Sequence, residues 1–592
     1  MNDTLDLLIM LATGLSCTSA FVFLFLRHLH IFQLEGYHKI SFLKWVVLRE
    51  LASVKISLGL LLFIALQFIA VDVRTADLKD YAENTVSVSS PQDAPSPQDT
   101  VSPQDDTLPL GTRRYVQDIP KQLHFLEINA VLLKIFTIVL LVTVAVLCSL
   151  HRNTKKPLVF TNRVKRLCVT YGLLIAAYLI LILNSGIAYI TATTVPLAVV
   201  LGIPLADIVI SPFEAANRAK YVRQARGLLR DWNGVPIGIT GSFGKTSVKF
   251  YLGELLQIRY NTLVTPRSFN TPMGIVKTIR EELRPLTEYF VCEMGAVRTR
   301  EISELCDIVK PKYGIITSVG NQHLETFGSV ENIVNTKFEL AESVAQNGGT
   351  VFINTDSERI AERYFREIEN RKPARWAKSA VTYGFAKEAQ YRAFGVSVSA
   401  EGTRFSIAFP NGEVKAYTTS LIGEHNVVNI TGAVAAAHTL GVTEDETVFG
   451  VRKIKPVPHR MEVIRHTDVT VIDDGFNSNP SGARAALDTL SLLGGEDSDT
   501  VTRVFISPGM VELGEDEANE NRRLGKYAAD KCDYAVLIGE RRADSLRLGL
   551  IDGGFQKNRI AVVANLNAAL AFAKSLPKKQ VILIENDLPD NY

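Results

Sequence analysis

Residues 237–249, which read IGITGSFGKTSVK, decide how this chain folds. Val235, Ile237 and Ile239 indicate a buried strand, and a turn with two glycines follows them. After the turn, apolar residues recur at helical spacing. Free N–H groups and the dipole at the start of such a helix attract anions. The stretch therefore predicts a phosphate-binding site between a strand and a helix.

The residues of this turn indicate which groups would contact a nucleotide. The stretch fits T-G-x-x-G-K-T, but Ile239 stands where the full phosphate-loop pattern has its first glycine. Lys245 would add a charge for the β- and γ-phosphates, and Thr246 would add a hydroxyl for Mg²⁺. The predicted nucleotide-binding residues of the loop are Thr240, Gly241, Ser242, Gly244, Lys245, Thr246 and Ser247.

Length and composition indicate several domains and give no reason to expect a nucleic-acid partner. The chain has 592 residues and a formal net charge of +2. Its mean hydropathy is +0.13, and the apolar excess lies almost wholly in the first part of the chain. Its six cysteines include no C-x-x-C pair, so neither a zinc ribbon nor a disulfide framework is predicted.

Residues 1–211 predict a transmembrane region of about five helical spans. The placement of Lys and Arg between the apolar segments predicts an N-terminus outside and a cytoplasmic location for everything after residue 211. The predicted spans are Leu7–Leu26, Val54–Val71, Ile128–Leu150, Leu167–Ser185 and Ala188–Ile210.

Two polar segments accompany these apolar ones. Residues 82–115 lie in a connection that contains SPQD three times, which predicts a disordered outside loop. Residues 212–233 predict a basic juxtamembrane helix, whose side chains would contact anionic lipid headgroups or form an ordinary solvated helix face.

From residue 234 onward, strands and helices alternate, which predicts parallel α/β sheets with helices on both faces. We expect a central phosphate-loop domain over 234–455 and a Rossmann-like C-terminal domain over 456–592. Besides the first strand, the predicted strands are Tyr289–Cys292, Tyr313–Thr317, Thr350–Ile353, Val469–Ile472, Arg503–Ser507, Tyr534–Ile538, Arg559–Val563 and Gln580–Ile584.

Further polar residues lie where they could serve a nucleotide site. Glu293 ends a strand in FVCEMGA, which is where a doubly wound sheet places an Mg²⁺ ligand. Taken singly, His323 and Lys337 would more often be an ordinary loop histidine and a solvated lysine. The remaining clusters contain His425, Asn426 and Asn429, and then Arg460, Asp473 and Asp474.

In this order the clusters resemble the motifs of the Mur ligases, a family of ATP-dependent carboxylate–amine ligases. The motifs are ITGSFGKTSVK, SFNTPMGI, VCEMGA, GNQHLETFGSVENIVNTKFEL, GEHNVVNITGAVAAA, PHRMEVI with DDGFNSNPSG, and GMVELGEDE. Within the family they are most similar to the branch that adds D-alanyl-D-alanine to a cell-wall precursor. The resemblance covers roughly residues 234–592.

The resemblance implies a catalytic set around ATP and Mg²⁺. It implies that Lys245 holds phosphates, and that Thr246 and Glu293 bind Mg²⁺. It implies a second Mg²⁺ near His323 and near Lys337, which matches a lysine that becomes carbamylated.

The same resemblance implies contacts with the nucleotide and the substrates. It places Asn426 and Asn429 towards the adenine, Arg460 towards the γ-phosphate and Asp474 towards the ribose, and it assigns to the substrates Asn270, Thr271, Asn477 and Asn479.

The predicted reaction is ATP-dependent amide-bond formation through an acyl phosphate. Three departures from the family stand out. Phe243 replaces a usual Asn, the ending VILIENDLPDNY lacks a usual Lys-Gly-Ser stretch, and apolar segments replace the domain that binds a UDP-sugar. The expected partners are therefore ATP, an amino acid or dipeptide, and a carboxylate on a lipid-linked or polymeric envelope precursor at the bilayer.

Alternatives remain at this point. The spans could merely anchor an ordinary cytoplasmic ligase, or contact other envelope-synthesis proteins or a second copy. The chain could instead be the ATPase component of an envelope transport system, or a silent ATP-binding regulator. By resemblance, the expected location is the bacterial cytoplasmic membrane, with several spans and cytoplasmic catalytic domains.

Overall fold

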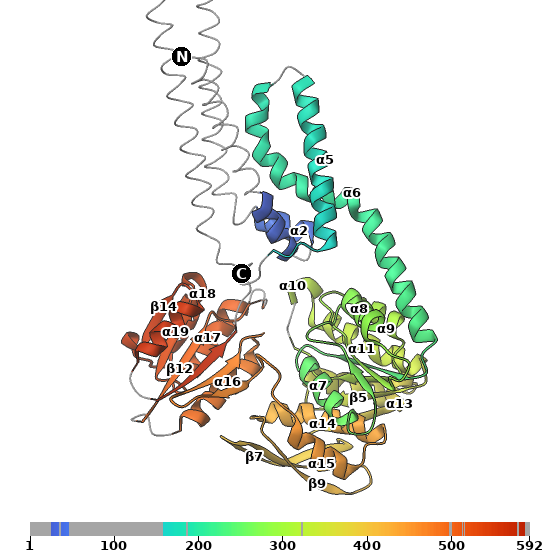
Figure 1. The fold of residues 1–592 in the computed structure, drawn as a ribbon. Coiled ribbons are helices and arrows are strands. Elements are labelled where there is room, and N and C mark those ends of the chain that lie inside the picture. The colour runs from blue at the N-terminus through green and yellow to red at the C-terminus, as the bar shows by residue number, and fades with distance from the viewer. Residues whose placement is uncertain are drawn as a thin grey trace, which may run out of the picture. The chain divides into compact units, whose positions relative to one another are not determined.

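The computed structural model divides the described chain into two units, one ending at Ala216 and one running from Asn217 to Leu588 (Figure 1). It describes residues 25–34, 37–46, 158–184, 188–320, 324–476, 478–495, 500–511, 513, 516–576 and 579–586.

The first unit is helical. Its elements are a helical stretch over 25–34, α2 (Lys39–Trp45), α5 (Asn162–Asn184) and the first part of α6 (Ala188–Arg230). Their apolar side chains form a small core that includes Leu29, Phe32, Phe42, Leu167, Tyr171 and Ile203. Asp207 is buried beside this core, where Lys39 and Arg163 form ion pairs with it at 3.0 and 3.1 Å.

The predicted multi-pass location in the bacterial inner membrane is wrong. No helix in the described part of the chain is long and apolar enough to cross a bilayer. Some apolar residues of α5 and α6 pack on one another beside Asp207, whereas others, such as Val169 and Leu173, are exposed. The predicted loop over 82–115 lies outside the described residues. Three other predicted spans also lie wholly or largely outside them: Leu7–Leu26, Val54–Val71 and Ile128–Leu150.

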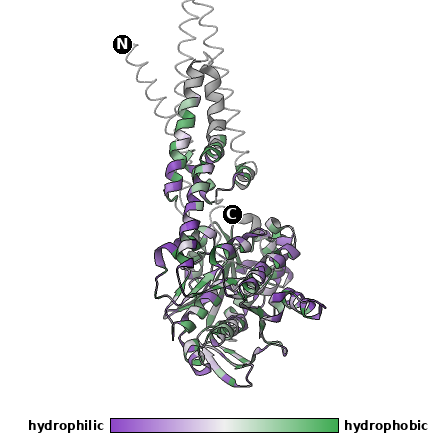
Figure 2. Cartoon of the chain, turned by 90° about the vertical axis from the view of Figure 1, so that its right-hand side faces the viewer, coloured by the Kyte–Doolittle hydropathy of each residue, from purple (hydrophilic) through white to green (hydrophobic). Residues whose placement is uncertain are grey.

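Hydropathy changes along α6. Residues before Pro212 are mostly apolar, whereas those after it include five Lys or Arg residues up to Arg230 (Figure 2). Residues 212–230 of the predicted segment 212–233 thus form the end of one 43-residue helix. Ala225 in this last part is fully buried, and Tyr221 and Leu229 pack on the same core of the second unit.

A nine-stranded sheet in the order β2-β3-β1-β4-β5-β6-β7-β8-β9 begins the second unit. The strands from β2 to β7 pair in parallel, whereas β7, β8 and β9 pair antiparallel. The bounds are β1 (Val235–Thr240), β2 (Thr262–Val264), β3 (Tyr289–Glu293), β4 (Tyr313–Ile316), β5 (Thr350–Asn354), β6 (Ala380–Gly384), β7 (Tyr391–Ser399), β8 (Gly402–Ala408) and β9 (Val414–Thr419).

Helices cover both faces of this sheet, as the buried clusters and Figure 1 show. One face packs against α7 (Lys245–Leu256), α14 (Glu424–Thr439) and α15 (Glu444–Lys453). The other packs against α8 (Pro272–Glu282), α9 (Glu301–Val309), α11 (Val330–Gln346), α12 (Glu358–Glu369) and α13 (Arg375–Lys378). A short helix, α10 (Leu324–Phe327), precedes α11.

A six-stranded sheet in the order β10-β11-β15-β12-β13-β14 follows. Only the pair β10 and β11 is antiparallel among the described strands of this sheet. Its strands are β10 (Glu462–Arg465), β11 (Val469–Asp474), β12 (Val501–Ser507), β13 (Tyr534–Ile538), β14 (Ile560–Val563) and β15 (Lys579–Glu585). Its helices are α16 (Pro480–Gly494), α17 (Glu517–Ala528), α18 (Glu540–Asp552) and α19 (Leu566–Ser575).

The prediction of parallel α/β sheets is confirmed. The predicted strands recur with ends shifted by no more than two residues, whereas β2, β6, β7, β8, β9 and β10 were not predicted. The last four of these pair antiparallel at the edges of the sheets, and three of those four alternate buried with more exposed residues.

Candidate functional site

The phosphate loop follows β1, which lies between β3 and β4 near the middle of the large sheet. Gly241 and Gly244 have φ angles of 152° and 80°. A Cβ on Gly241 would lie 2.1 Å from the Thr317 hydroxyl oxygen. Gly244 precedes α7 without a side-chain cap, so the first N–H groups of this helix remain free for an anion.

Bonds with the loop after β4 fix this conformation. The Ser242 N–H donates to the Ser318 carbonyl at 2.6 Å, and the Phe243 N–H donates to the Ser318 hydroxyl at 3.1 Å. Because these contacts use backbone N–H groups of the loop, a phenylalanine at position 243 is accommodated without loss of the loop's conformation.

Lys245 lies over the loop. Its ammonium donates to the carbonyls of Gly241 and Ser242, at 2.7 and 2.9 Å. Burial lowers the pKa of Lys245 to about 8, although the charge of Glu293 raises it. A phosphate would offer this ammonium anionic oxygens in place of loop carbonyls.

Glu293 ends β3 and is 1% exposed. Its Oε1 accepts hydrogen bonds from the Thr246 hydroxyl at 3.1 Å and from the Asn270 amide at 3.0 Å. Burial would raise the pKa of Glu293, but the charges of Lys249 and Lys245 outweigh it and hold the pKa below its ordinary value. The site therefore keeps a buried, ionised carboxylate beside the phosphate loop.

This carboxylate fits an Mg²⁺ ion. Glu293 Oε2 is buried, and its partner among the described residues is the Lys249 ammonium, 3.0 Å away. The described residues hold no cluster of three or more His, Cys, Asp or Glu side chains that could bind a metal. Mg²⁺ is commonly held by one or two carboxylates together with substrate phosphates and water, so a single carboxylate such as Glu293 beside the Thr246 hydroxyl would suit it.

Lys337 lies on α11 and is 2% exposed. No described residue forms a hydrogen bond or ion pair with its ammonium, which lies 5.6 Å from the ring centre of Phe327. Burial lowers the pKa of Lys337 to about 7, and the charge of Lys245 contributes. A sizeable neutral fraction is therefore present near pH 7. His323 lies outside the described residues.

Arg460 and Asp474 belong to the part of the second unit that contains the six-stranded sheet, and their side chains make different contacts. The Arg460 guanidinium donates to the Thr246 hydroxyl at 3.3 Å, so it reaches the start of α7. Asp474 accepts from the Met461 N–H at 3.1 Å, and burial raises the pKa of Asp474 to about 6.

Several predicted site residues make internal contacts instead. Asn426 accepts from the Tyr251 hydroxyl at 2.9 Å and donates to the Ile422 carbonyl, so its side chain links α14 to α7. The hydroxyl of Thr240 donates to the Met294 carbonyl. Thr271 and Asn479 cap the N-termini of α8 and α16.

The three remaining predicted residues lie in different places. Asn429 lies at the phosphate loop, where its Oδ1 would be 2.5 Å from a Cβ on Gly244. Ser247 is buried in the first turn of α7. Asn477 lies outside the described residues.

The sequence analysis missed Lys249, whose ammonium pairs with Glu293. Its signal was a lysine one helical turn after Lys245, beside the apolar residues Val248, Tyr251 and Leu252.

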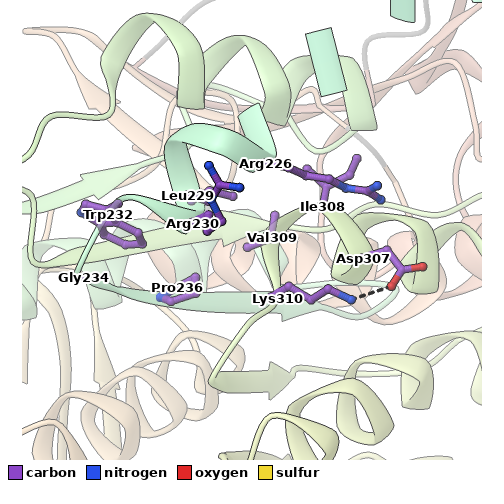
Figure 3. Close-up of a pocket in the computed structure, with 10 residues that line it drawn as sticks. All are labelled: Arg226, Leu229, Arg230, Trp232, Gly234, Pro236, Asp307, Ile308, Val309 and Lys310. Carbon is purple, nitrogen blue, oxygen red and sulfur yellow. Dashed lines mark hydrogen bonds and ion pairs between the residues drawn. The ribbon is translucent and has the colours of Figure 1, made fainter. Parts of the chain in front are cut away.

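A pocket of about 680 Å³ lies elsewhere in the second unit (Figure 3). Arg226, Arg230, Trp232, Pro236 and Lys310 are among its lining residues. Since β1 runs from Val235 to Thr240, this pocket adjoins the start of the strand and contains none of the predicted site residues.

Family models match most of the second unit. The model "Mur ligase middle domain" matches residues 239–437, and "Mur ligase, glutamate ligase domain" matches residues 459–585.

Similar curated proteins carry one name, "UDP-N-acetylmuramoyl-tripeptide--D-alanyl-D-alanine ligase". The Mycobacterium leprae protein is 31% identical over 355 residues, which are 57% of this chain and 68% of that one. The Bacillus subtilis protein is 27% identical over 318 residues, covering 53% and 65%. The chain thus spans about two thirds of the length of these two relatives.

A solved structure gives the same picture. "Crystal structure I of MurF from Acinetobacter baumannii" has a TM-score of 0.53 at 25% identity and covers 62% of this chain and 77% of that one. Together with the M. leprae match, these findings show that the chain belongs to the Mur ligase family and is an ATP-dependent, ADP-forming ligase that uses ATP and Mg²⁺.

Proposed function

We propose that this ligase joins the amine of an amino acid or dipeptide, with D-alanyl-D-alanine as the first candidate, to a carboxylate of a cell-envelope precursor. The single observation that carries the proposal is the contact of Thr246 with both Glu293 and Arg460, at 3.1 and 3.3 Å. It joins the phosphate loop, an acidic metal ligand and a cation from the other domain. The names of the curated relatives supply the candidate amine.

The residues fit a reaction that passes through an acyl phosphate. An acceptor carboxylate oxygen attacks the γ-phosphorus of ATP, and the bond to the β-phosphate oxygen breaks to release ADP. The amine then attacks the acyl carbon, loses a proton, and displaces phosphate to leave an amide. Attack by one anion on another requires neutralisation of charge, which Lys245, Arg460 and the N–H groups of α7 provide.

When bound, Mg²⁺ would supply further neutralisation of phosphate charge. We propose Thr246 and Glu293 as its protein ligands, because the Thr246 hydroxyl and the ionised Glu293 carboxylate meet beside the phosphate loop.

We also propose that Lys337 is carbamylated. A neutral amine attacks the carbon of CO₂, and loss of a proton leaves an N-carboxylate that carries a negative charge. Burial and the nearby charge of Lys245 lower the pKa of Lys337 and favour the uncharged form, although the charges of Glu301 and Glu339 oppose this.

The test measures phosphate release from ATP by the purified chain. A panel of amino acids and dipeptides is combined with acceptors whose carboxylate is carried by a nucleotide-linked or a lipid-linked precursor. We expect release that requires both an amine and an acceptor, with an amide product by mass spectrometry. Release that ignores every amine and acceptor would contradict the proposal and favour a transport ATPase.

Two variants separate the site from the fold. Glu293→Gln removes the charge with little change in shape and should lower kcat at least about 100-fold, or about 2.7 kcal/mol. The control Glu281→Gln alters a carboxylate that is 56% exposed on α8 and should leave kcat unchanged. Near-normal turnover by Glu293→Gln would contradict the proposed metal role.

A further inference from the structure

Lys249 carries a buried positive charge, and Glu293 is the carboxylate that pairs with it. Its side chain is fully buried on α7, one turn after Thr246. Lysine is almost never fully buried unless it is paired. Its ammonium lies 3.0 Å from Glu293 Oε2 and also donates to the carbonyl of Arg267. One side chain thus joins the phosphate-loop helix, the end of β3 and the loop after β2.

The loop over 265–271 surrounds the same carboxylate. Thr265 accepts from the Glu293 N–H at 3.1 Å, and Asn270 donates to Glu293 Oε1 at 3.0 Å. Arg267 has a φ of 48°, which non-glycine residues rarely adopt, and its carbonyl receives the Lys249 ammonium. Loop and carboxylate are therefore held by a common set of bonds.

Stability alone does not account for such a pair. Replacement of a buried ion pair by neutral side chains is often tolerated, whereas loss of one partner is strongly destabilising. The charge at Lys249 needs a reason beyond packing.

We propose that Lys249 is a positioning residue that fixes the Glu293 carboxylate and the 265–271 loop in the arrangement that receives the metal–nucleotide complex. The inference rests on the proposed Mg²⁺ role of Glu293. Lys249 acts through Glu293, because its ammonium faces Oε2 and the Arg267 carbonyl. Replacing a residue that orients a metal ligand without touching the metal typically lowers metal affinity 10- to 100-fold.

The test is a double-mutant cycle with Lys249→Met, Glu293→Gln and the two combined. Binding of Mn²⁺ in the presence of ADP is followed by the electron paramagnetic resonance signal of free Mn²⁺. ADP affinity without metal is measured separately by calorimetry, and thermal unfolding reports the fold. The control Lys574→Met replaces an exposed lysine on α19 and should match the wild type in every measurement.

We expect each single variant to weaken Mn²⁺ binding about 10- to 100-fold. The double variant should bind Mn²⁺ no more weakly than Glu293→Gln alone, because Lys249 has no separate route to the metal. ADP affinity without metal should change less than about threefold in Lys249→Met, whereas a general loss of structure would weaken both ligands.

Each contrary result has its own meaning. Wild-type Mn²⁺ affinity in Lys249→Met, or additive losses in the double variant, would overturn the role of Lys249 and leave the metal role of Glu293 standing. Wild-type affinity in Glu293→Gln would overturn the metal role itself. If Lys249→Met does not fold, Lys249→Gln keeps a donor for the Arg267 carbonyl without the charge, and the same outcomes decide.

Discussion

Glu585 shows how burial sets the chemistry of one residue. It ends β15, is fully buried, and lies in register beside Asp474. Its carboxyl group accepts hydrogen bonds from the hydroxyls of Ser507, at 3.0 Å, and Ser478. Burial raises the pKa of Glu585 to about 7, although these two bonds lower it. The folded chain therefore holds a proton there that an unfolded chain would release near pH 4.5.

This difference in pKa between the folded and the unfolded chain lowers the free energy of unfolding as pH rises. Between about pH 4.5 and 7 the folded state binds more protons than the unfolded state, so the free energy of unfolding falls through that window and then levels off. Glu585→Gln cannot ionise, so this pH dependence should vanish and the sheet should gain about 1–3 kcal/mol at pH 8.

Amide exchange of β15, corrected for intrinsic rates at pH 5 to 8, measures this gain. Glu281→Gln, which alters an exposed carboxylate on α8, is the control. Equal protection of β15 in the wild type and in Glu585→Gln at pH 8 would show that the pKa of Glu585 is not raised in the folded chain.

Some site residues could be predicted from the sequence. Lys245, Thr246 and Glu293 follow from a loop pattern and a strand end, and the structure brings them together with Arg460. Lys249 could not be recognised in this way, because its role depends on burial against a carboxylate far along the chain. The caps made by Thr271 and Asn479 look the same in sequence as substrate-binding side chains.

At the scale of elements, α17 and α18 meet through two glycines. A Cβ on Gly525 would lie 2.2 Å from the Leu546 carbonyl oxygen, and one on Gly549 would lie 2.0 Å from that of Arg522. Backbone cannot yield as a flexible side chain does. The close approach of the two helices thus depends on the absence of these side chains.

Gly549→Ala should therefore lower the free energy of unfolding by more than about 2 kcal/mol. Helix propensity alone predicts the opposite sign, a gain of about 1 kcal/mol for Ala over Gly. Gly227→Ala on α6 is the matched control, because a Cβ there meets no atom within 4 Å and should give the small gain. Denaturant unfolding of both variants decides, and stabilisation by Gly549→Ala would mean that the helices lie further apart.

The limits of sequence reasoning are also visible in the strands. Most parallel strands were predictable because buried apolar runs alternate with helices, as in β4 and β12, although the parallel strands β2 and β6 were missed. The hairpins of β7, β8 and β9 were not, because edge strands bury fewer residues and carry polar side chains between the buried ones. Pairing with the neighbouring strand, rather than a buried apolar run, determines them.

For the whole molecule, the largest error concerned the first unit. Hydropathy counts apolar residues without regard to what covers them: Leu167, Tyr171 and Ile203 belong to one buried cluster with Phe32, whereas Val169 and Leu173 are exposed. The second unit was easier to predict, because several motifs in a fixed order constrain it.

The end of α6 supplies a test of how the second unit is completed. Ala225 is fully buried, and Tyr221, Val222 and Leu229 pack against the core formed with α8 and α9. Arg218 also pairs with Glu304 on α9. The end of α6 thus precedes the phosphate loop in sequence but belongs to the hydrophobic core of the second unit, which contains that loop.

A chain of residues 217–592 should therefore unfold at nearly the same temperature as the second unit in the full chain and bind ADP with the same affinity. A chain of residues 234–592 should unfold at a lower temperature, because it exposes the apolar residues Ile279, Leu305 and Val309 that the end of α6 helps to cover. Calorimetric unfolding and ADP titration of both chains make the comparison. Equal unfolding temperatures would mean that the last part of α6 is only a connection. A lower unfolding temperature for the shorter chain would show that the 17 residues from 217 to 233 contribute buried apolar surface to the core of the second unit.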